Sequence, residues 1–149
     1  MTKYAYHYRS NAGSTQGART RFGHVANLGK LLSVKGIRFN STAFGFQSSK
    51  ERVQVRGENG TATYDGLCWG YFGEGPCGLV ELLAGHCGIE KPAAEMVACS
   101  SLRKDKTGID WEINLETKEF KGGLRLPRAV DLVTRHGCQY LFRETPVPA

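Results

Sequence analysis

The chain has 149 residues, 40% of them hydrophobic and 23% charged, which favours one globular domain whose core needs no disulfide bonds. No apolar run is long enough to cross a membrane, and the N-terminus lacks the apolar segment of a secretory signal, so we expect a cytoplasmic protein. The net charge of +6 is uneven: residues 1–50 hold eight Lys or Arg and neither Asp nor Glu, which favours an anionic partner. A basic surface that only faces water is the alternative.

Alternating side chains predict that the first half of the chain is made of short strands. Three tyrosines alternate with smaller or polar residues near the N-terminus, as in a half-buried strand. Residues 10–20 are small and polar, and they predict a mobile loop with Arg19 and Arg21 at its far end. Strands are expected, in chain order, at residues 3–9, 21–26, 30–34, 36–40, 43–47, 52–56 and 61–64.

Helical periodicity begins in the second half of the chain. Leu79, Leu82 and Leu83 form an apolar stripe, which predicts a helix over residues 76–85 or 76–88. Residues 109–115 alternate most clearly of all, with Ile109 and Trp111 expected to point inward and Asp110 outward. The other expected elements are a helix at 92–102, strands near 120 and 124–126, a helix from Pro127 to His136, a strand at 139–142 and a tail at 144–149.

Together these elements predict one α+β domain over residues 1–149, with a mainly antiparallel sheet of short strands and about three short helices. Glycine accounts for 19 residues, nearly twice its usual share of about 7%, which indicates many tight turns rather than a helical bundle. We find no internal repeat and no linker that would divide the chain.

Residues 69–83 are the most informative stretch of the sequence. An aromatic strand runs into a turn with Gly73, Gly75 and Gly78, and the turn opens directly into the Leu-rich helix. The first N–H groups of a helix have no partner within it and lie at the positive end of its dipole, where anions bind. The glycines would allow positive φ angles and the close approach of a ligand. The alternative is a turn whose glycines let helix and sheet pack closely.

This turn matches neither of the two common phosphate-binding loops. No Gly-Lys-Ser/Thr follows it, as a Walker loop requires. Its glycine spacing lacks the parallel strand-helix-strand unit and the distal acid of a dinucleotide site. In addition, Pro76 removes one N–H from the turn, and Glu74 would repel a phosphate unless its carboxylate points away.

Aromatic and basic side chains complete the predicted site. Aromatic rings beside arginines can sandwich a base, and two arginines on one strand face, as in residues 52–56, can clamp a phosphate. Aromatic residues at strand spacing are also typical of a core, and the arginines of a strand face can simply be solvated. The predicted ligand-binding residues are Trp69, Tyr71, Gly73, Gly75, Cys77, Gly78, Arg19, Arg21, Arg52 and Arg56.

The cysteines and histidines predict neither a metal site nor a catalytic site. Five cysteines without a secretory signal fit a reduced compartment. His86 and Cys87, with His136 and Cys138, could offer zinc ligands, but their spacing matches no common zinc module. Cys77 lies at a helix start, which lowers a thiol pKa, yet no base stands out beside it. We therefore expect no cofactor, no metal and no catalytic residue, and favour a binding protein over an enzyme without excluding the enzyme.

Residues 67–83 read Leu-Cys-Trp-Gly-Tyr-Phe-Gly-Glu-Gly-Pro-Cys-Gly-Leu-Val-Glu-Leu-Leu. This segment resembles a family of small uncharacterised proteins from bacteria and their phages, which carry an aromatic-Trp-Gly-Tyr-x-Gly-x-Gly-Pro segment before a Leu/Ala-rich helix. The chain departs from that family at Glu74, where a small polar residue is usual, and in its longer C-terminal region. The resemblance implies a phage or mobile-element context, in which small basic proteins commonly sequester a ligand, block a host enzyme or coat nucleic acid.

Three binding functions follow from these observations. The first is the sequestration of a nucleotide or another phosphorylated small-molecule signal of antiviral defence, in the cytoplasm of the host cell. The second is a nucleic-acid-binding module, which the acid-free residues 1–50 favour. The third is an inhibitor that docks on a host enzyme. Each function is compatible with a homo-oligomer, and none requires a membrane.

Overall fold

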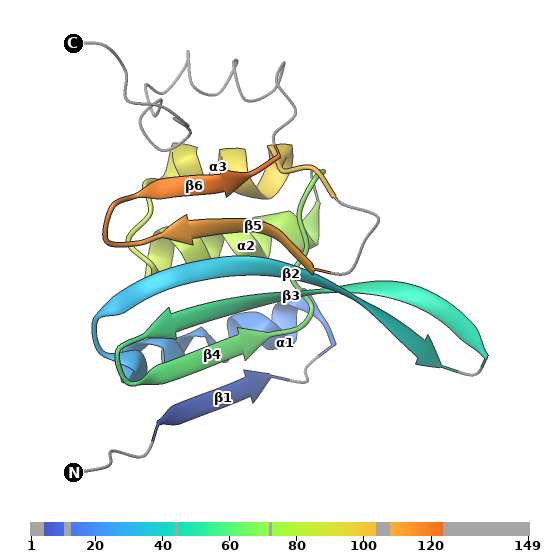
Figure 1. Ribbon diagram of the computed structural model, residues 1–149, viewed down its shortest axis with the longest axis horizontal. Coiled ribbons are helices and arrows are strands. Elements are labelled where there is room, and N and C mark those ends of the chain that lie inside the picture. The colour runs from blue at the N-terminus through green and yellow to red at the C-terminus, as the bar shows by residue number, and fades with distance from the viewer. Residues whose placement is uncertain (1–4, 11–12, 44, 72, 104–107, 124–149) are drawn as a thin grey trace.

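Six strands form one sheet, and the helices lie against one of its faces (Figure 1). The computed structural model describes residues 5–10, 13–43, 45–71, 73–103 and 108–123. The strand order is β1-β4-β3-β2-β5-β6, and every neighbouring pair is antiparallel except β1 and β4. The predicted α+β class is thus confirmed. The elements are β1 Tyr6–Ser10, α1 Thr15–Arg19, the 3-10 helix η1 Phe22–Leu28, β2 Leu31–Ala43, β3 Phe46–Gly57, β4 Gly60–Tyr64, α2 Glu74–His86, α3 Lys91–Ser100, β5 Gly108–Asn114 and β6 Glu119–Gly122.

The long strand β2 replaces the separate short strands that the sequence predicts around Gly36. The glycine lies inside the strand because the indole of Trp111, on the neighbouring strand β5, packs directly on it. A Cβ atom at Gly36 would overlap with that indole. Gly36 therefore provides space for a large core side chain instead of ending the strand.

The segment between β1 and β2 also differs from the prediction. The strand expected at residues 21–26 is wrong, because the segment forms η1. Its large apolar residues Phe22, Val25 and Leu28 recur at every third position, which is the period of a 3-10 helix, and all three are buried. Residues 10–20, expected to be a loop, contain α1. Ser14 caps this short helix by accepting a hydrogen bond from Gly17 N at 3.1 Å.

The described elements of the second half follow their sequence patterns more closely. The predicted Leu-rich helix is α2, and its three leucines are fully buried. The helix expected at 92–102 is α3, and the strand expected at 109–115 is β5. No helix among the described residues is long and apolar enough to span a lipid bilayer. The helix predicted from Pro127 to His136 and the strand at 139–142 lie outside the described residues.

The core fills the space between the sheet and the helices. On β3, Val53 and Val55 are fully buried in this layer, whereas Arg52, Gln54 and Arg56 alternate with them and belong to the opposite face. None of the described helices covers that opposite face, which we call the open face (Figure 1). An antiparallel sheet with one face in the core and one in water commonly shows this alternation.

Candidate functional site

The glycine turn joins the core to the start of α2, as the sequence predicts. After the buried Trp69, Gly70 adopts a φ of 95° and donates its N–H to the carbonyl of Ala98 on α3 at 2.8 Å. Gly73 is the N-cap residue of α2, and no side chain caps this helix end. The start of α2 therefore has no side-chain acceptor for its first N–H groups, which is the condition under which an anion is favoured there.

Close packing, and not a positive φ, explains the three glycines of the turn. Gly73 has an extended φ of 175°, and none of the three is among the described residues with a positive φ. The expectation that they supply left-handed backbone is therefore wrong. A side chain at any of them would clash with a neighbour, which is the Tyr71 ring at Gly73, Cys68 Sγ at Gly75, and Thr15 with Leu67 at Gly78.

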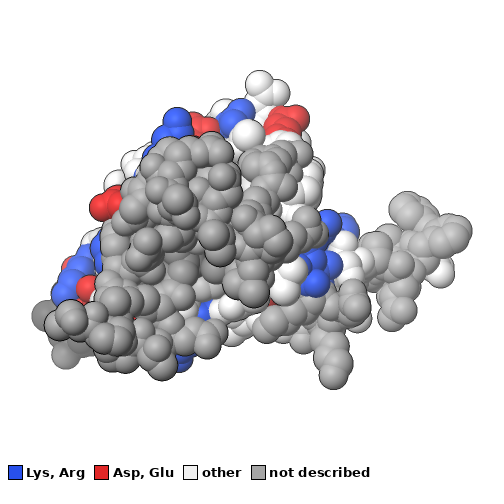
Figure 2. All heavy atoms as spheres, turned by 90° about the horizontal axis from the view of Figure 1, so that it is seen from above, with Lys and Arg blue, Asp and Glu red and all other residues white. Residues whose placement is uncertain are grey.

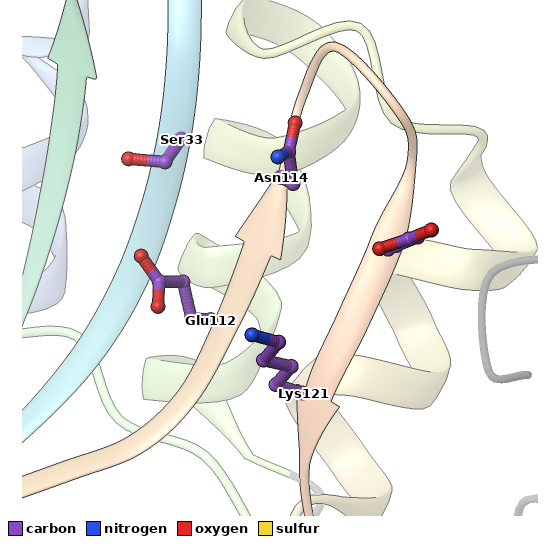
Figure 3. Close-up of a pocket in the computed structure, with 5 residues that line it drawn as sticks. Ser33, Glu112, Asn114 and Lys121 are labelled. Atoms are coloured by element: carbon purple, nitrogen blue, oxygen red, sulfur yellow. The ribbon is translucent and has the colours of Figure 1, made fainter. Parts of the chain in front are cut away.

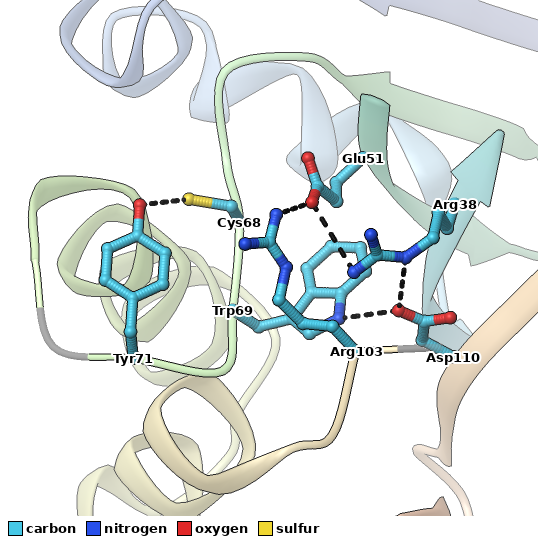
Figure 4. Close-up of polar contacts among 7 residues, drawn as sticks. All are labelled: Arg38, Glu51, Cys68, Trp69, Tyr71, Arg103 and Asp110. Carbon is cyan, nitrogen blue, oxygen red and sulfur yellow. Dashed lines mark hydrogen bonds and ion pairs between the residues drawn. The ribbon is translucent and has the colours of Figure 1, made fainter. Parts of the chain in front are cut away.

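Trp69, a predicted ligand-stacking residue, belongs to a buried polar cluster instead (Figure 4). Its Nε1 donates to Asp110 Oδ2 at 3.0 Å, and Arg38 Nε donates to the same oxygen at 3.2 Å. Arg38 also lies 3.6 Å from Glu51, which in turn accepts Arg103. The exposed fractions of the Arg38 and Asp110 side chains are 8% and 0%, so these charges are removed from water and hold one another.

A β-bulge in β5 brings Asp110 into this buried polar cluster. The register pairs Gly36 with Trp111 and Ile37 with Ile109, which leaves Asp110 as the extra residue. Asp110 and Trp111 are both buried, whereas Ile109 is 44% exposed. The sequence alternation, which predicts Ile109 inward and Asp110 outward, is therefore wrong at these two positions. A bulge shifts the inward–outward alternation of side chains by one residue, and no local pattern in the sequence predicts this bulge.

The exposed part of the turn carries Tyr71 and Cys68. Tyr71 is 41% exposed, and its hydroxyl lies 2.8 Å from Cys68 Sγ. The bond to Cys68, and then burial, raises the pKa of Tyr71 to about 12, and burial raises the pKa of Cys68. Arg103 lies 5.9 Å from the centre of the Tyr71 ring. Both acidic groups are therefore protonated at neutral pH and offer hydrogen bonds, while neither is primed as a nucleophile.

Arg19 and Arg21, predicted to reach the turn, have partners of their own on the helix side. Arg19 Nε lies 2.6 Å from Glu81 Oε2, so this pair ties α1 to α2. Arg21 donates to the carbonyl of Gly17 at 2.8 Å. These guanidinium groups therefore support local structure in the described chain, and neither is recorded in contact with the glycine turn.

Arg52 and Arg56 lie on the open face, which is the face of the sheet opposite to the turn. Arg52 Nε lies 2.8 Å from Asp65 Oδ1, and its guanidinium carbon lies 4.1 Å from the centre of the Phe39 ring. Arg56 is exposed, and no ion pair is recorded for it in the described part of the chain. The ten predicted ligand-binding residues are thus divided between two faces, and the structure does not assemble them into one pocket.

Two rows of side chains cross the open face from strand to strand. We call the part of these rows on β1, β4, β3 and β2 the basic face. Arg9, Lys35 and Arg56 are its charged residues, and none of them forms an ion pair within the described residues. The first row is Arg9, Thr63, Gln54, Lys35, Glu112 and Lys121, and the second is His7, Thr61, Arg56, Ser33, Asn114 and Glu119.

Hydroxyl and amide groups fill the basic face between its charges. His7 Nδ1 lies 2.9 Å from Thr61 Oγ1, and Gln54 donates to Thr63 Oγ1 at 3.3 Å. Alternation within each strand could have placed Arg9 and Lys35 on a solvent-facing side. The basic face cannot be predicted from local alternation, because alternation does not give the strand order that makes these strands neighbours.

The other half of the open face, on β5 and β6, has a mixed charge. A shallow pocket of about 200 Å³ lies there, lined by Ser33, Glu112, Asn114, Glu119 and Lys121 (Figure 3). Basic and acidic side chains also lie beside one another on the described surface at this end of the molecule (Figure 2). The carboxylates offset the lysine, so this half attracts a polyanion less than the basic face does.

Cys77, the remaining predicted site residue, lies neither beside Tyr71 nor on the open face. It is exposed on α2 and lines a largely apolar groove of about 570 Å³ between α2 and α3, with Val80, Ala84 and Cys99. No group of three or more His, Cys, Asp or Glu among the described residues could hold a metal ion. His136 and Cys138 lie outside the described part of the chain.

No protein-family model matches the chain, and the searches of curated proteins and of solved structures found no significant match. The resemblance seen at residues 67–83 therefore stays a prediction from the sequence.

Proposed function

We propose that the chain is a non-enzymatic binding protein that takes the phosphate backbone of a nucleic acid on its basic face. One observation carries this proposal: the strand register gathers Arg9, Arg56 and Lys35 from three strands onto one face of the sheet, which none of the described helices covers (Figure 1). Neighbouring strands lie about 4.8 Å apart, so the three cations span roughly 14 Å. Such a width fits several phosphates of one strand better than a single small anion.

The charge distribution favours a polyanion over a neutral ligand. Near the basic face, Asp65 is already paired with Arg52, and Glu51 points into the buried polar cluster. None of these three cations forms an ion pair with a described carboxylate, although Glu112 lies opposite Lys35 in the register, so Arg9 and Arg56 keep their charge most fully for a ligand. Hydroxyl and amide groups between the cations can donate further hydrogen bonds to phosphate and sugar. Binding of this kind needs no general base.

Fluorescence anisotropy with labelled DNA and RNA oligonucleotides at 50 to 200 mM salt tests the proposal. The logarithm of the affinity should fall linearly with the logarithm of the salt concentration, because each phosphate contact releases counterions. The double variant R9Q/R56Q should lose about two units of that slope and at least tenfold in affinity. The control R21Q/K91Q removes the same charge from the helix side and should bind like the unmodified chain.

Any of three results would overturn the proposal. The first is that the unmodified chain binds no oligonucleotide at low salt, and the second is that its affinity does not depend on salt. The third is that R9Q/R56Q and R21Q/K91Q weaken binding equally. The last result would mean that net charge, and not the basic face, accounts for the affinity.

The start of α2 supports a second candidate function, the sequestration of a nucleotide or another phosphorylated small-molecule signal. The helix start has no side-chain cap, and Tyr71 and Arg103, which are 41% and 40% exposed, lie beside it. Glu51 and Glu74 oppose an anion here, and for this reason we rank the candidate second. A thermal-shift screen with cyclic dinucleotides, cyclic trinucleotides and ADP-ribose derivatives tests it. A shift that Y71A abolishes would support it, and no shift with any compound would remove it. A phage origin and docking on a host enzyme stay predictions from the sequence.

A further inference from the structure

The open face carries an apolar patch next to the basic face. Strand alternation places Ile37 and Phe39 on the same face of β2 as Lys35, and both are half-buried. Ile109, on β5, lies opposite Ile37 in the register and is 44% exposed. None of the described helices covers this face (Figure 1). We call Ile37, Phe39 and Ile109, together with the adjacent Arg52, the stacking patch.

Arg52 is held over this patch from two directions. In the register it lies opposite Ile37, on the neighbouring strand β2. Its guanidinium carbon lies 4.1 Å from the centre of the Phe39 ring, and its Nε lies 2.8 Å from Asp65 Oδ1. The Arg52 side chain is still 25% exposed. Because its planar group is already fixed, little further ordering is needed before a flat ligand stacks on it.

A line of basic and polar side chains on β3 passes through the stacking patch. Four side chains of this strand share the open face by alternation: Arg56, Gln54, Arg52 and Lys50. Arg56 and Lys50 are exposed, and no ion pair is recorded for either within the described residues. The two cations lie about 20 Å apart along the strand. This line therefore offers positive charge at both ends and an apolar surface between them.

Such a surface matches a ligand that has both phosphates and flat, apolar faces. In a double helix the faces of the bases are stacked on one another, so mainly phosphates and base edges are accessible to a protein. A single strand also has unpaired bases, which stack on aromatic rings and on the guanidinium planes of arginines. The stacking patch therefore favours a single strand over a duplex.

From these observations we propose that the nucleic acid bound by the chain is single-stranded. Its phosphates lie along Arg56 and Lys50, and an unpaired base between them stacks on the Arg52–Phe39 pair. This inference rests on the proposed function and specifies its ligand. Single-stranded DNA and single-stranded RNA share the chemistry that the patch recognises, so both are measured.

The first test compares ligands and uses only the unmodified chain, so it does not depend on the folding of a variant. The probes are a strand of about 12 nucleotides, as DNA and as RNA, the DNA duplex of the same sequence, and the DNA strand with abasic sites in place of its bases. The abasic strand keeps every phosphate. Fluorescence anisotropy at one salt concentration should show that the ordinary DNA strand binds at least fivefold more tightly than the duplex or the abasic strand. The tighter of the DNA and RNA strands identifies the preferred sugar.

The second test changes the stacking groups and keeps the charge. F39L retains an apolar side chain without a ring, and R52K retains the positive charge without a planar group. Each should weaken binding of the ordinary strand at least fivefold, and F39Y, which keeps the ring, should bind like the unmodified chain. Y8L is the matched control, because Tyr8 is also half-buried but stacks on His24, with ring centres 3.6 Å apart, on the side of the sheet that faces the core. Y8L should bind like the unmodified chain.

The outcomes separate this inference from the proposed function. R9Q/R56Q should weaken binding of the ordinary and the abasic strand by the same factor, whereas F39L and R52K should weaken binding of the ordinary strand alone. A duplex or an abasic strand that binds as tightly as the ordinary strand, or equal losses in F39L and Y8L, would overturn the role of the stacking patch and leave the basic face intact. No binding of any nucleic acid by the unmodified chain would end both proposals.

Discussion

The buried polar cluster and the basic face use the same residue type for opposite purposes. Arg38 is almost completely removed from water, and two carboxylates from neighbouring strands compensate its charge. Arg9 and Arg56 are exposed, and no described carboxylate compensates them. A buried guanidinium without its partners destabilises a fold, whereas an exposed one has little effect on stability and keeps its charge for a ligand. The environment of each arginine therefore separates the structural role of Arg38 from the binding role that we propose for Arg9 and Arg56.

Removing a charge from the buried polar cluster should lower the free energy of unfolding more than any other change described below. We expect D110N to lower the free energy of unfolding by about 3 kcal/mol, because the buried Arg38 guanidinium then loses one of the two carboxylates that balance its charge. D65N breaks the partly exposed pair with Arg52 and should cost about 0.5 kcal/mol. Urea unfolding followed by circular dichroism measures both variants. Equal losses would show that burial does not distinguish these two ion pairs.

Crowding the core should have the next largest effect. G36A places a methyl group against the Trp111 indole and should destabilise the chain by about 2 kcal/mol, because a well-packed core resists added volume. G85A is the matched control, since nothing lies within 4 Å of a Cβ atom at that helical position. The control should leave stability unchanged or raise it by about 0.5 kcal/mol. A harmless G36A would mean that Trp111 does not pack on the strand as described.

Substitutions in the basic face should weaken binding of oligonucleotides but leave the stability of the fold nearly unchanged. R9Q/R56Q should leave the free energy of unfolding within about 0.5 kcal/mol of that of the unmodified chain, because exposed substitutions away from a core have small effects. R38Q, in contrast, should clearly destabilise the chain. The comparison is made by thermal melting of the unmodified chain, R9Q/R56Q and R38Q, together with their affinities for the oligonucleotides. A large loss of stability in R9Q/R56Q would assign these arginines to the fold.

A buried thiol, Cys87, should make the stability of the fold depend on alkaline pH. Burial raises the pKa of Cys87 from its ordinary value of 9.0 to about 12, whereas Cys77 is exposed. The folded state therefore favours the neutral Cys87 thiol, and its contribution to stability is complete below pH 9 and declines as the pH rises towards 12. Between pH 8 and 10, C87A should lose less unfolding free energy than the unmodified chain, by about 1 kcal/mol. Equal losses in C87A and in the unmodified chain would exclude a role for the Cys87 thiol.

Local patterns in the sequence were sufficient wherever neighbouring residues decide the structure. The spacing of Leu79, Leu82 and Leu83 predicts α2, and the alternation of residues 52–56 predicts which side of β3 is buried. The α+β class and the position of the glycine turn follow from the same kind of reasoning. Each of these features depends on side chains within one or two turns of one another, so a short window contains the physical information.

Contacts between distant segments decided the rest. Gly36 lies inside a strand because Trp111, 75 positions later, packs on it, and a bulge at Asp110 moves a carboxylate from the expected open face into the core. Arg9, Lys35 and Arg56 become neighbours only because β1 pairs with β4 and β3 lies between β4 and β2. Local patterns were enough to predict α2, α3 and β5, and the composition shows the excess of basic residues in the first third of the chain. Only the folded chain shows which charges are buried and which stay exposed, because strand order and register are set by the packing of the whole chain.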